Sequence, residues 1–557
     1  MPNFIRPFSL FAFLSLACAA QAAAPQPSPA PTQPKLVVVL VVDGLPNEQV
    51  LRYRGQFGAG GFRRLMEHGA YFQNAHQAHG VTVTAVGHAA VLTGAYPYMH
   101  GIVGNNWINP ANRQGMYCTE DREHTYLGVK TQPSDGTSPR NLRVNTMGDE
   151  LRYSNGNQSK VVTVSGKDRG AILLAGKTGT AYMYADDTGQ FMTSSYYMAS
   201  YPQWVTRFND AKPADQYYGK NWTPLLPPAA YAHDADDDLV APRTAGEDRN
   251  RFPFAMASDS GQLDAKYYNR LRSSPFLDKL TLDFARAAIA GENLGKNPAG
   301  VPDVLGISLS SHDYINHAYG PESRASHDHV QQLDRLLASF FNDLDKSVGL
   351  DNTIVVLTAD HGFPNTPEFY QSRKFDAGRV DGKKLVAGLD AHLAATFKLT
   401  KPVTAYLLPG IHLDYEQIAQ AGLKREDVEQ AAARWLAKQP GIADALTRTQ
   451  LENGAVPRTR LGTLMQRAWH RDNSGDVLLV MKPYWIIGYG KHGTTHGAPY
   501  AYDTNVPLFM MGKRWLKPGP SGAYTEVQDI APTLSYLLGV RPPAGAEGRV
   551  LAEFLQR

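Results

Sequence analysis

The stretch Leu36-Val37-Val38-Val39-Leu40-Val41-Val42-Asp43-Gly44 joins seven consecutive apolar residues directly to an aspartate. Residues 353–362 (TIVVLTADHG) repeat the arrangement and end in Asp360-His361-Gly362. Unbroken runs of Val, Ile and Leu are typical of parallel strands that are buried on both faces. In parallel α/β sheets, ligands bind beyond the carboxyl ends of the strands. The two runs therefore predict carboxylates and an imidazole at one edge of a sheet, where they indicate a metal site.

Further runs of this kind, separated by helical patterns, predict an α/β fold with a doubly wound, mainly parallel sheet and helices on both faces. The other strand-like runs are 160–165, 303–309 and 476–481, and helical stretches include 61–68, 145–153, 328–345 and 527–539. Two segments interrupt the pattern and are predicted to be inserted lobes. Residues of about 170–300 are rich in Tyr, Trp, Pro and Gly and predict irregular and hairpin structure. Residues of about 366–490 contain the amphipathic stretch 415–437.

The start of the chain differs from the rest. Arg6 precedes an apolar stretch from Phe8 to Ala20, and Ala20-Gln21-Ala22 matches a small-residue cleavage site. Residues 1–22 therefore predict a secretory signal peptide, and residues 23–34 a Pro-rich linker. We expect an exported protein, periplasmic or secreted, with no membrane association after removal of the signal.

Composition limits the possible partners and ligands. The 55 basic and 52 acidic residues nearly balance, so nothing indicates nucleic acid or a membrane surface as a partner. Outside the predicted signal peptide, Cys118 is the only cysteine. An intramolecular disulfide and thiolate metal clusters are therefore excluded, and a metal site has to use histidine, carboxylate and hydroxyl groups.

Two further segments carry ligand-type residues. Asp313 and His317 lie four residues apart, on one face of a predicted helix that follows the run 303–309. Residues 491–497 (KHGTTHG) form a glycine-rich loop that carries His496. Alone, each segment is also compatible with a surface pair or a polar turn. Together with the two strand ends, they predict a site at which several elements meet.

The candidate ligands are three carboxylates and three imidazoles: Asp43, Asp313, Asp360, His317, His361 and His496. This set is too large for one tetrahedral zinc with an open position, and it suits two neighbouring ions. Imidazole nitrogens argue against magnesium and calcium, which prefer oxygen ligands. Zinc is therefore the expected ion, with manganese or iron as alternatives.

A candidate nucleophile lies in residues 81–94 (VTVTAVGHAAVLTG), which predict a helix that begins near Thr84 and ends at Gly94. A hydroxyl at a helix N-terminus lies at the positive end of the helix dipole, and a bound metal would lower its pKa much further. The alternative interpretation is that Thr82 or Thr84 is simply an N-cap residue.

The motifs in their order resemble the alkaline phosphatase superfamily, and most closely its nucleotide pyrophosphatase/phosphodiesterase-like branch with a threonine nucleophile. The motifs are Asp43, Thr84-x-x-x-His88, Thr93-Gly94, residues 101–105 (GIVGN), Asp313-x-x-x-His317, residues 360–362 (DHG) and residues 494–497 (TTHG). They extend over nearly the whole chain after the linker. The resemblance therefore implies one catalytic domain, residues 35–557.

The resemblance also implies roles for particular residues. One zinc would be held by Asp313, His317 and His496, and the other by Asp43, Asp360 and His361 together with Thr84, the nucleophile. Asn105 matches an asparagine that donates to a phosphoryl oxygen in the family. Two zinc ions per chain are expected.

Lys167 and Arg169 bear on the choice between monoesters and diesters. They follow the run 160–165, and alternate residues of an extended segment point the same way. Such a pair can hold two phosphoryl oxygens, and two cations favour the more negative monoester. The alternative is a solvated loop neutralised by Asp168. The segment resembles the Lys-x-Arg element of the PafA-type threonine-dependent alkaline phosphatases.

These observations lead to the hypothesis of an exported, zinc-dependent alkaline phosphatase. It would hydrolyse small phosphate monoesters through a covalent phosphothreonine and release inorganic phosphate. The first alternative is a phosphodiesterase or nucleotide pyrophosphatase on the same two-metal core, and the second is an exported binding protein without catalytic activity. The natural substrate and the oligomeric state are left open by the sequence.

Overall fold

A nine-stranded sheet organises the chain, with strand order β20-β2-β19-β12-β1-β11-β6-β7-β8. Its five central strands are all parallel: β12 (Thr353–Thr358), β1 (Leu36–Val42), β11 (Asp303–Leu309), β6 (Val161–Ser165) and β7 (Thr180–Tyr184). Antiparallel pairings occur only toward the edges, where β19 (Phe509–Met511) joins β12 and β8 (Phe191–Met192) joins β7. The sheet is completed by β2 (Ala70–Phe72) and β20 (Gly519–Ser521). The predicted, mainly parallel sheet is confirmed.

The computed structural model describes residues 1–2, 33–109, 112–235, 251–488 and 492–556. Apart from residues 1–2, the predicted signal peptide lies outside the described residues, and so does the predicted linker except for its last two residues. The described residues contain no helix long and apolar enough to cross a membrane.

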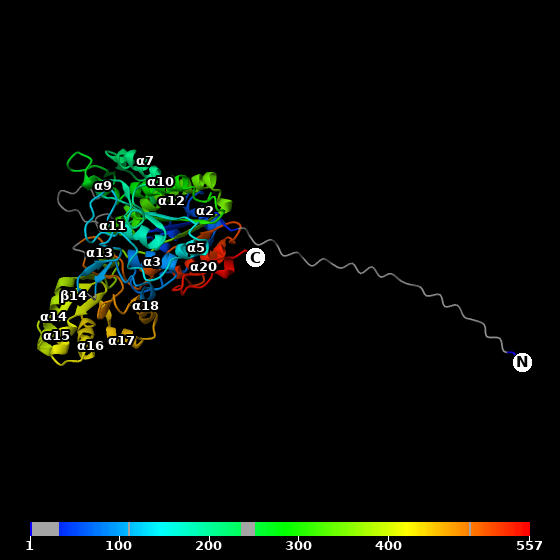
Figure 1. The fold of residues 1–557 in the computed structure, drawn as a ribbon. Coiled ribbons are helices and arrows are strands. Elements are labelled where there is room, and N and C mark those ends of the chain that lie inside the picture. Colours follow the sequence, from blue (N-terminus) through cyan, green and yellow to red (C-terminus); the bar gives the residue numbers. More distant parts are fainter. Residues whose placement is uncertain (3–32, 110–111, 236–250, 489–491, 557) are drawn as a thin grey trace. The chain divides into compact units, whose positions relative to one another are not determined.

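Helices cover both faces of the sheet (Figure 1). One layer contains α10 (Pro275–Glu292) and α12 (Arg324–Ser347), which pack on each other. The other contains α3 (Thr84–Thr93), α5 (Met147–Ser154), α6 (Asp168–Ala175) and α20 (Ile530–Leu538). Every residue of β1 is fully buried between the layers, which explains its unbroken apolar run.

Most predicted helices form close to their expected positions. The stretch 61–68 corresponds to α2 (Phe62–His68), and α5, α12 and α20 correspond to the other three. The helix predicted to open near Thr84 begins at that residue and is followed by Gly94. The amphipathic stretch 415–437 forms two helices, α15 (Tyr415–Gln420) and α16 (Arg425–Leu436).

A second sheet is entirely antiparallel and has the order β14-β15-β17-β16. Its strands are β14 (Val403–Leu407), β15 (Gly410–Leu413), β17 (Val477–Met481) and β16 (Ile442–Thr447). With α14 (Gly382–Phe397), α15 and α16, which Figure 1 shows grouped beside β14, they enclose a separate apolar core. We call residues 382–487 the antiparallel lobe. The assignment of the run 476–481 to the parallel sheet was wrong, because a short apolar run does not specify its partner strand.

Residues of about 170–300 contain more regular structure than expected. Strand β7 belongs to the main sheet and α10 to its covering layer, so the prediction of irregular and hairpin structure was wrong for these elements. The remainder includes α7 (Gln203–Asp210), α9 (Ala265–Leu271) and one short antiparallel pair, β9 (Asn221–Trp222) with β10 (Phe254–Ala255). The composition of the whole segment does not describe α10, whose buried Leu277, Leu280, Phe284 and Ala288 recur at helical spacing.

The register of the central strands places their carboxyl ends at one level. Val41 pairs with both Ser308 and Thr358, and Ser308 also pairs with Ser165. The residues that follow these strands are therefore delivered to the same edge of the sheet. Gly44 makes the approach possible: its φ is +71°, and a Cβ atom there would lie 3.1 Å from the Cα atom of Asp313.

Candidate metal centre

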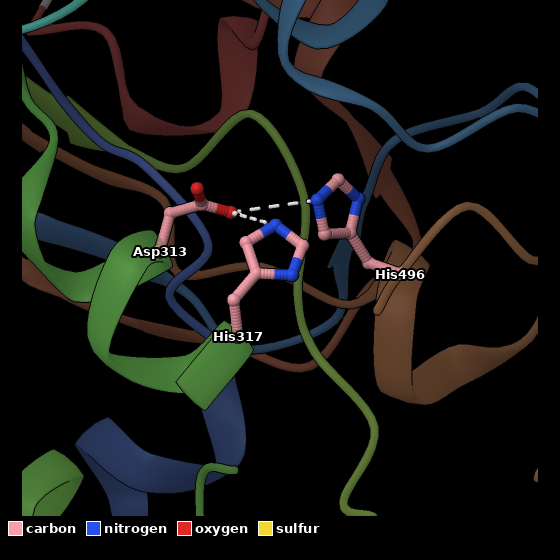
Figure 2. A group of neighbouring side chains, drawn as sticks. All are labelled: Asp313, His317 and His496. Carbon is pink, nitrogen blue, oxygen red and sulfur yellow. Dashed lines mark ion pairs between the residues drawn. The ribbon is translucent and has the colours of Figure 1, made fainter. Parts of the chain in front are cut away.

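One group of potential ligands combines a helix and a distant loop. Asp313 and His317 lie one turn apart on α11 (Ser311–Tyr319), and His496 approaches from the loop residues 492–500 (Figure 2). The Asp313 Oδ1 atom lies 3.4 Å from the Nε2 atom of His317 and 3.4 Å from that of His496. The three ligand atoms lie close enough together to bind one ion.

A second group forms beside the first and consists of Asp43, Asp313 and His361. The His361 Nε2 atom lies 3.5 Å from Asp43 Oδ1 and 3.9 Å from Asp313 Oδ1. Asp360, expected in this set, lies next to it, with its Oδ2 atom 3.5 Å from His361 Nε2. Asp313 therefore belongs to both groups, whereas the sequence placed it in only one.

The three imidazoles are all oriented by backbone carbonyl groups. Nδ1 of His317 lies 2.9 Å from the carbonyl oxygen of Thr494, Nδ1 of His361 lies 2.9 Å from that of Gly362, and Nδ1 of His496 lies 2.7 Å from that of Thr82. A carbonyl oxygen can only accept, so each Nδ1 must donate its hydrogen. Each Nε2 atom then presents a lone pair to the carboxylates, as in histidines that bind a metal.

Burial keeps two of these imidazoles neutral. Desolvation lowers the pKa of His317 to about 4, although Asp313 opposes the change. Desolvation also lowers the pKa of His361 to about 3, again against the effect of a neighbouring carboxylate, Asp360. Both rings therefore hold a free lone pair at neutral pH and need not lose a proton to bind a metal.

Within the described residues, several buried carboxylate oxygens have no hydrogen-bond partner: Oδ1 of Asp43, Oδ1 of Asp313 and Oδ2 of Asp360. Among the same residues, the one nearby ammonium group is Lys167 Nζ, 2.7 Å from Asp43 Oδ2 and 2.6 Å from Asp313 Oδ2. Three carboxylates thus face a single ammonium. Burial, and then the charge of Asp360, raise the pKa of Asp43 well above its usual value. The donor set is therefore incomplete without further cations and fits bound metal ions.

Thr84 is the first residue of α3 and is buried. Two contacts hold the start of this helix. The Ala85 N–H donates to Oδ1 of Asn105 at 3.0 Å, which places the asparagine beside the threonine. His88 donates from Nδ1 to the Thr84 carbonyl oxygen at 2.9 Å, and the same nitrogen lies 3.1 Å from Asp360 Oδ2. The helix can pack this closely because position 87 is glycine: a Cβ atom there would lie 2.0 Å from the Asp360 carbonyl oxygen.

Lys167 and Arg169 both line one cavity of about 460 Å³, but the backbone conformation of the pair differs from the predicted extended segment. Helix α6 begins at Asp168, so only Lys167 has extended backbone geometry. Arg169 is therefore helical, and the prediction that it belongs to an extended segment was wrong. Lys167 is buried. Burial lowers the pKa of its ammonium group, but the charges of Asp313 and Asp43 raise that pKa by more, so the ammonium stays charged. Arg169 donates to the Tyr117 hydroxyl at 3.1 Å.

Two residues that contact this site had no role in the sequence-based prediction. His88 was visible in the motif only as a residue four positions after Thr84, and the structure places it between α3 and Asp360. Phe363 packs edge-on against His317 and His496, with ring centroids 4.9 Å apart in each case. The signal for Phe363 was its position directly after the Asp-His-Gly motif.

The chain matches the family described as type I phosphodiesterase/nucleotide pyrophosphatase over residues 37–502, and it belongs to that family. The expected membership of this branch of the alkaline phosphatase superfamily is confirmed.

Similar proteins of known name support the same assignment. The chain is 35% identical to alkaline phosphatase PafA of Elizabethkingia meningoseptica over 531 residues, which cover 94% of this chain and 95% of that protein. It is 35% identical to alkaline phosphatase PhoV of Synechococcus elongatus over 528 residues, covering 94% and 93%. A protein of Myroides odoratus named as a calcium-transporting ATPase is 36% identical over 533 residues, covering 94% and 95%.

The fold also matches a solved structure. The crystal structure of wild-type PafA has a TM-score of 0.87 and 34% sequence identity, and the match covers 95% of this chain and 100% of that one. The predicted fold class and the prediction of an enzyme of the alkaline phosphatase type are thereby confirmed. The roles of the individual site residues stay predictions.

Proposed function

We propose that this chain is a zinc-dependent alkaline phosphatase that hydrolyses phosphate monoesters through a covalent phosphothreonine. The observation that carries the proposal is the meeting of two Asp/His groups with unpartnered buried oxygens at the carboxyl edge of the sheet. The helix that opens with Thr84 is joined to the same edge through His88 and Asp360.

Two zinc ions would be held by the residues of these groups: Asp313, His317 and His496 for one, and Asp43, Asp360 and His361 for the other. The ligands are nitrogen and oxygen atoms, and the three imidazoles favour zinc over magnesium or calcium. When bound, such ions supply positive charge to the oxygens of a phosphoryl group and lower the pKa of a neighbouring hydroxyl.

Thr84 is the proposed nucleophile. Its oxygen forms a bond to phosphorus while the bond between phosphorus and the ester oxygen breaks, and the hydroxyl proton is lost as the departing alcohol gains one. Water then attacks phosphorus, which releases inorganic phosphate and restores the hydroxyl. The position at the first residue of α3 favours the reaction, because the positive end of the helix dipole stabilises negative charge on this oxygen.

Asn105, Lys167 and Arg169 would hold the remaining phosphoryl oxygens. The Ala85 N–H occupies Oδ1 of Asn105, which leaves the Nδ2 hydrogens to donate. Lys167 contacts Asp43 and Asp313 and shares with Arg169 a cavity whose lining includes neither Thr84 nor Asn105. At the phosphoryl group, their two positive charges would favour a monoester dianion over a diester monoanion. A solved PafA mutant offers further support. Its replaced threonine, asparagine, lysine and arginine have the same spacing along that chain as Thr84, Asn105, Lys167 and Arg169 have here.

The second candidate is a phosphodiesterase or nucleotide pyrophosphatase, which the family description favours. Comparing kcat/KM for p-nitrophenyl phosphate, its bis-ester and p-nitrophenyl sulfate decides between the two. ATP belongs in the panel because one relative is named as an ATPase. We expect the monoester to be preferred by at least about a hundredfold, on the order of what one or two charge contacts contribute. A preference for the bis-ester would replace the proposal with the second candidate.

Zinc and export need separate measurements. Elemental analysis of the purified protein should find two zinc ions per chain, and manganese or iron in their place would correct the choice of metal. Export rests on the sequence of residues 1–22, of which 3–22 lie outside the described residues. Fractionation of cells that produce the full chain should recover activity outside the cytoplasm, with the N-terminus processed after Ala22. Activity confined to the cytoplasm would contradict this part of the proposal.

A further inference from the structure

Asp503 is a fully buried carboxylate outside the candidate ligand set. It lies in the short helix α19 (Ala501–Thr504). Its Oδ2 atom accepts hydrogen bonds from the N–H groups of Gly497 at 2.9 Å and Ala498 at 2.8 Å. These are the two residues directly after His496. The carboxylate therefore holds the loop that carries this imidazole.

The same loop is also joined to the segment before the proposed nucleophile. The Thr82 hydroxyl donates to the carbonyl oxygen of Ala498 at 3.0 Å and lies 3.5 Å from Asp503 Oδ2. The Thr82 carbonyl oxygen accepts from His496 Nδ1 at 2.7 Å. A short closed network thus connects Asp503, the His496 loop and the residue two positions before Thr84.

The backbone of Asp503 reaches the other group of ligands. Its carbonyl oxygen accepts from the Gly362 N–H at 2.7 Å, directly after His361. The contact requires glycine, because a Cβ atom at position 362 would lie 2.2 Å from the Tyr502 carbonyl oxygen. The rings of His361 and His496 stack with centroids 3.5 Å apart, so their loops must keep a fixed separation.

We propose that Asp503 is the positioning residue that sets the distance between the two metal-binding groups and aligns both with the start of α3. Its side chain fixes the loop of His496 and the Thr82 segment, while its carbonyl group fixes the loop of His361. The inference rests on the proposed function, because it concerns the same centre. Asp503 acts through hydrogen bonds to neighbouring loops and not as a ligand.

The hydrogen-bond geometry distinguishes two substitutions. In Asp503→Asn, an amide oxygen in the place of Oδ2 still accepts both N–H groups, and the NH2 group takes the place of Oδ1, which has no hydrogen-bond partner within the described part of the chain. In Asp503→Ala, both N–H groups lose their acceptor. The matched control is Asp529→Ala, because the buried Asp529 likewise accepts from two backbone N–H groups, those of Glu526 at 3.0 Å and Arg549 at 2.7 Å, in the segment that packs against the C-terminal end of α3.

The experiment measures zinc affinity by competition with a calibrated chelator on the full chain, together with kcat, KM and thermal unfolding. We expect Asp503→Ala to weaken zinc binding about 10- to 100-fold, the usual effect of losing a group that orients metal ligands. Asp503→Asn should stay within about threefold of wild type. Asp529→Ala should lower the melting temperature and leave zinc affinity unchanged.

Several results would overturn the inference. One is an Asp503→Ala protein with wild-type zinc affinity and only a lower melting temperature, like the control. Another is an Asp503→Asn protein as defective as Asp503→Ala, which would assign the effect to charge. If Asp503→Ala is insoluble, Thr82→Val serves instead: weaker zinc binding supports the inference, and unchanged binding contradicts it. Failure of the proposed function would look different, because the wild-type chain itself would then bind no zinc or cleave no ester.

Discussion

The carboxyl edge of the main sheet and the antiparallel lobe both bury carboxylates, but in opposite ways. In the lobe, Asp476 accepts from Arg448 Nε at 2.8 Å through one oxygen and from the Leu413 N–H at 2.8 Å through the other. At the sheet edge, Oδ1 of Asp43 has no hydrogen-bond partner within the described residues, and Oδ2 contacts only the Lys167 ammonium, at 2.7 Å. One carboxylate is fully paired and the other is not.

This difference separates a structural role from a functional one. A buried polar group normally finds its partners during folding, because leaving it unpaired costs free energy. Asp476 meets this expectation and stabilises the lobe. The unpaired atoms of Asp43, Asp313 and Asp360 do not, so the fold tolerates a cost at the edge that a bound ligand would offset. The antiparallel lobe has its own apolar core, and the carboxylate oxygens at the edge of the main sheet have lone pairs free to bind a ligand.

The largest effect is expected from Thr84→Ala. Loss of the nucleophile should reduce kcat for p-nitrophenyl phosphate by at least about a thousandfold, while zinc content and melting temperature stay near wild type. Single-turnover kinetics and elemental analysis on the same sample check this. Residual activity within tenfold of wild type would show that Thr84 is not the nucleophile for hydrolysis of p-nitrophenyl phosphate.

The next effect concerns Lys167→Ala combined with Arg169→Ala. We expect kcat/KM for the monoester to fall about a thousandfold and that for the bis-ester no more than about tenfold, because two positive charges that contact the phosphoryl oxygens are lost. Parallel assays of both esters at saturating zinc measure the ratio. Equal losses for both esters would mean that the pair does not select the substrate. Zinc content has to be checked, since Lys167 also contacts Asp43 and Asp313.

Asp476→Ala tests the lobe side of the comparison. Removing this carboxylate leaves the largely buried Arg448 without its nearest acid and should cost about 3 kcal/mol of unfolding free energy. Zinc affinity and kcat/KM should remain within about twofold of wild type, because no candidate ligand lies in the lobe. Urea unfolding and chelator competition provide the two measurements. A marked loss of zinc affinity in Asp476→Ala would contradict the structural role of this carboxylate, because it would then also affect the metal centre.

The last effect is a pH dependence of the free energy of unfolding, which arises from two buried histidines outside the antiparallel lobe. Burial lowers the pKa of His79 from 6.5 to about 3 and that of His100 well below 6.5. The unfolded chain therefore binds more protons below pH 6.5, so these rings contribute full stability above that pH and lose it as the pH falls toward about 3. Each should add about 1.4 kcal/mol per pH unit to the slope.

Urea unfolding in the presence of a chelator, at several pH values between 6.5 and 4, measures this slope without a contribution from metal release. Replacing both rings in His79→Gln/His100→Gln should flatten it. A change at the exposed His68 should leave it unaltered, since that ring meets water in both states. An unchanged slope in the double variant would assign the acid sensitivity to other groups.

Some features of the site could be predicted from the sequence because they depend on neighbouring residues. Asp43 comes directly after β1 and Asp360 two residues after the end of β12, both fully buried strands, and Asp313 and His317 occupy one turn of one helix. Thr84 opens its helix as its surroundings predicted. Other features could not be predicted. Arg169 enters its cavity from a helix, and β17 pairs in the antiparallel lobe, because a short segment does not define its own termination or partner.

By itself, the sequence determined the α/β class, the strand ends that carry acidic residues and the types of ligand available. Those properties follow from local periodicity and residue chemistry. Only the tertiary structure decided which atoms meet: that Asp313 belongs to both groups, that Lys167 bridges two carboxylates, and that Asp503 joins three loops. The physical reason is that most of these contacts join residues far apart in the chain, and they depend on strand register and loop packing that no local pattern encodes.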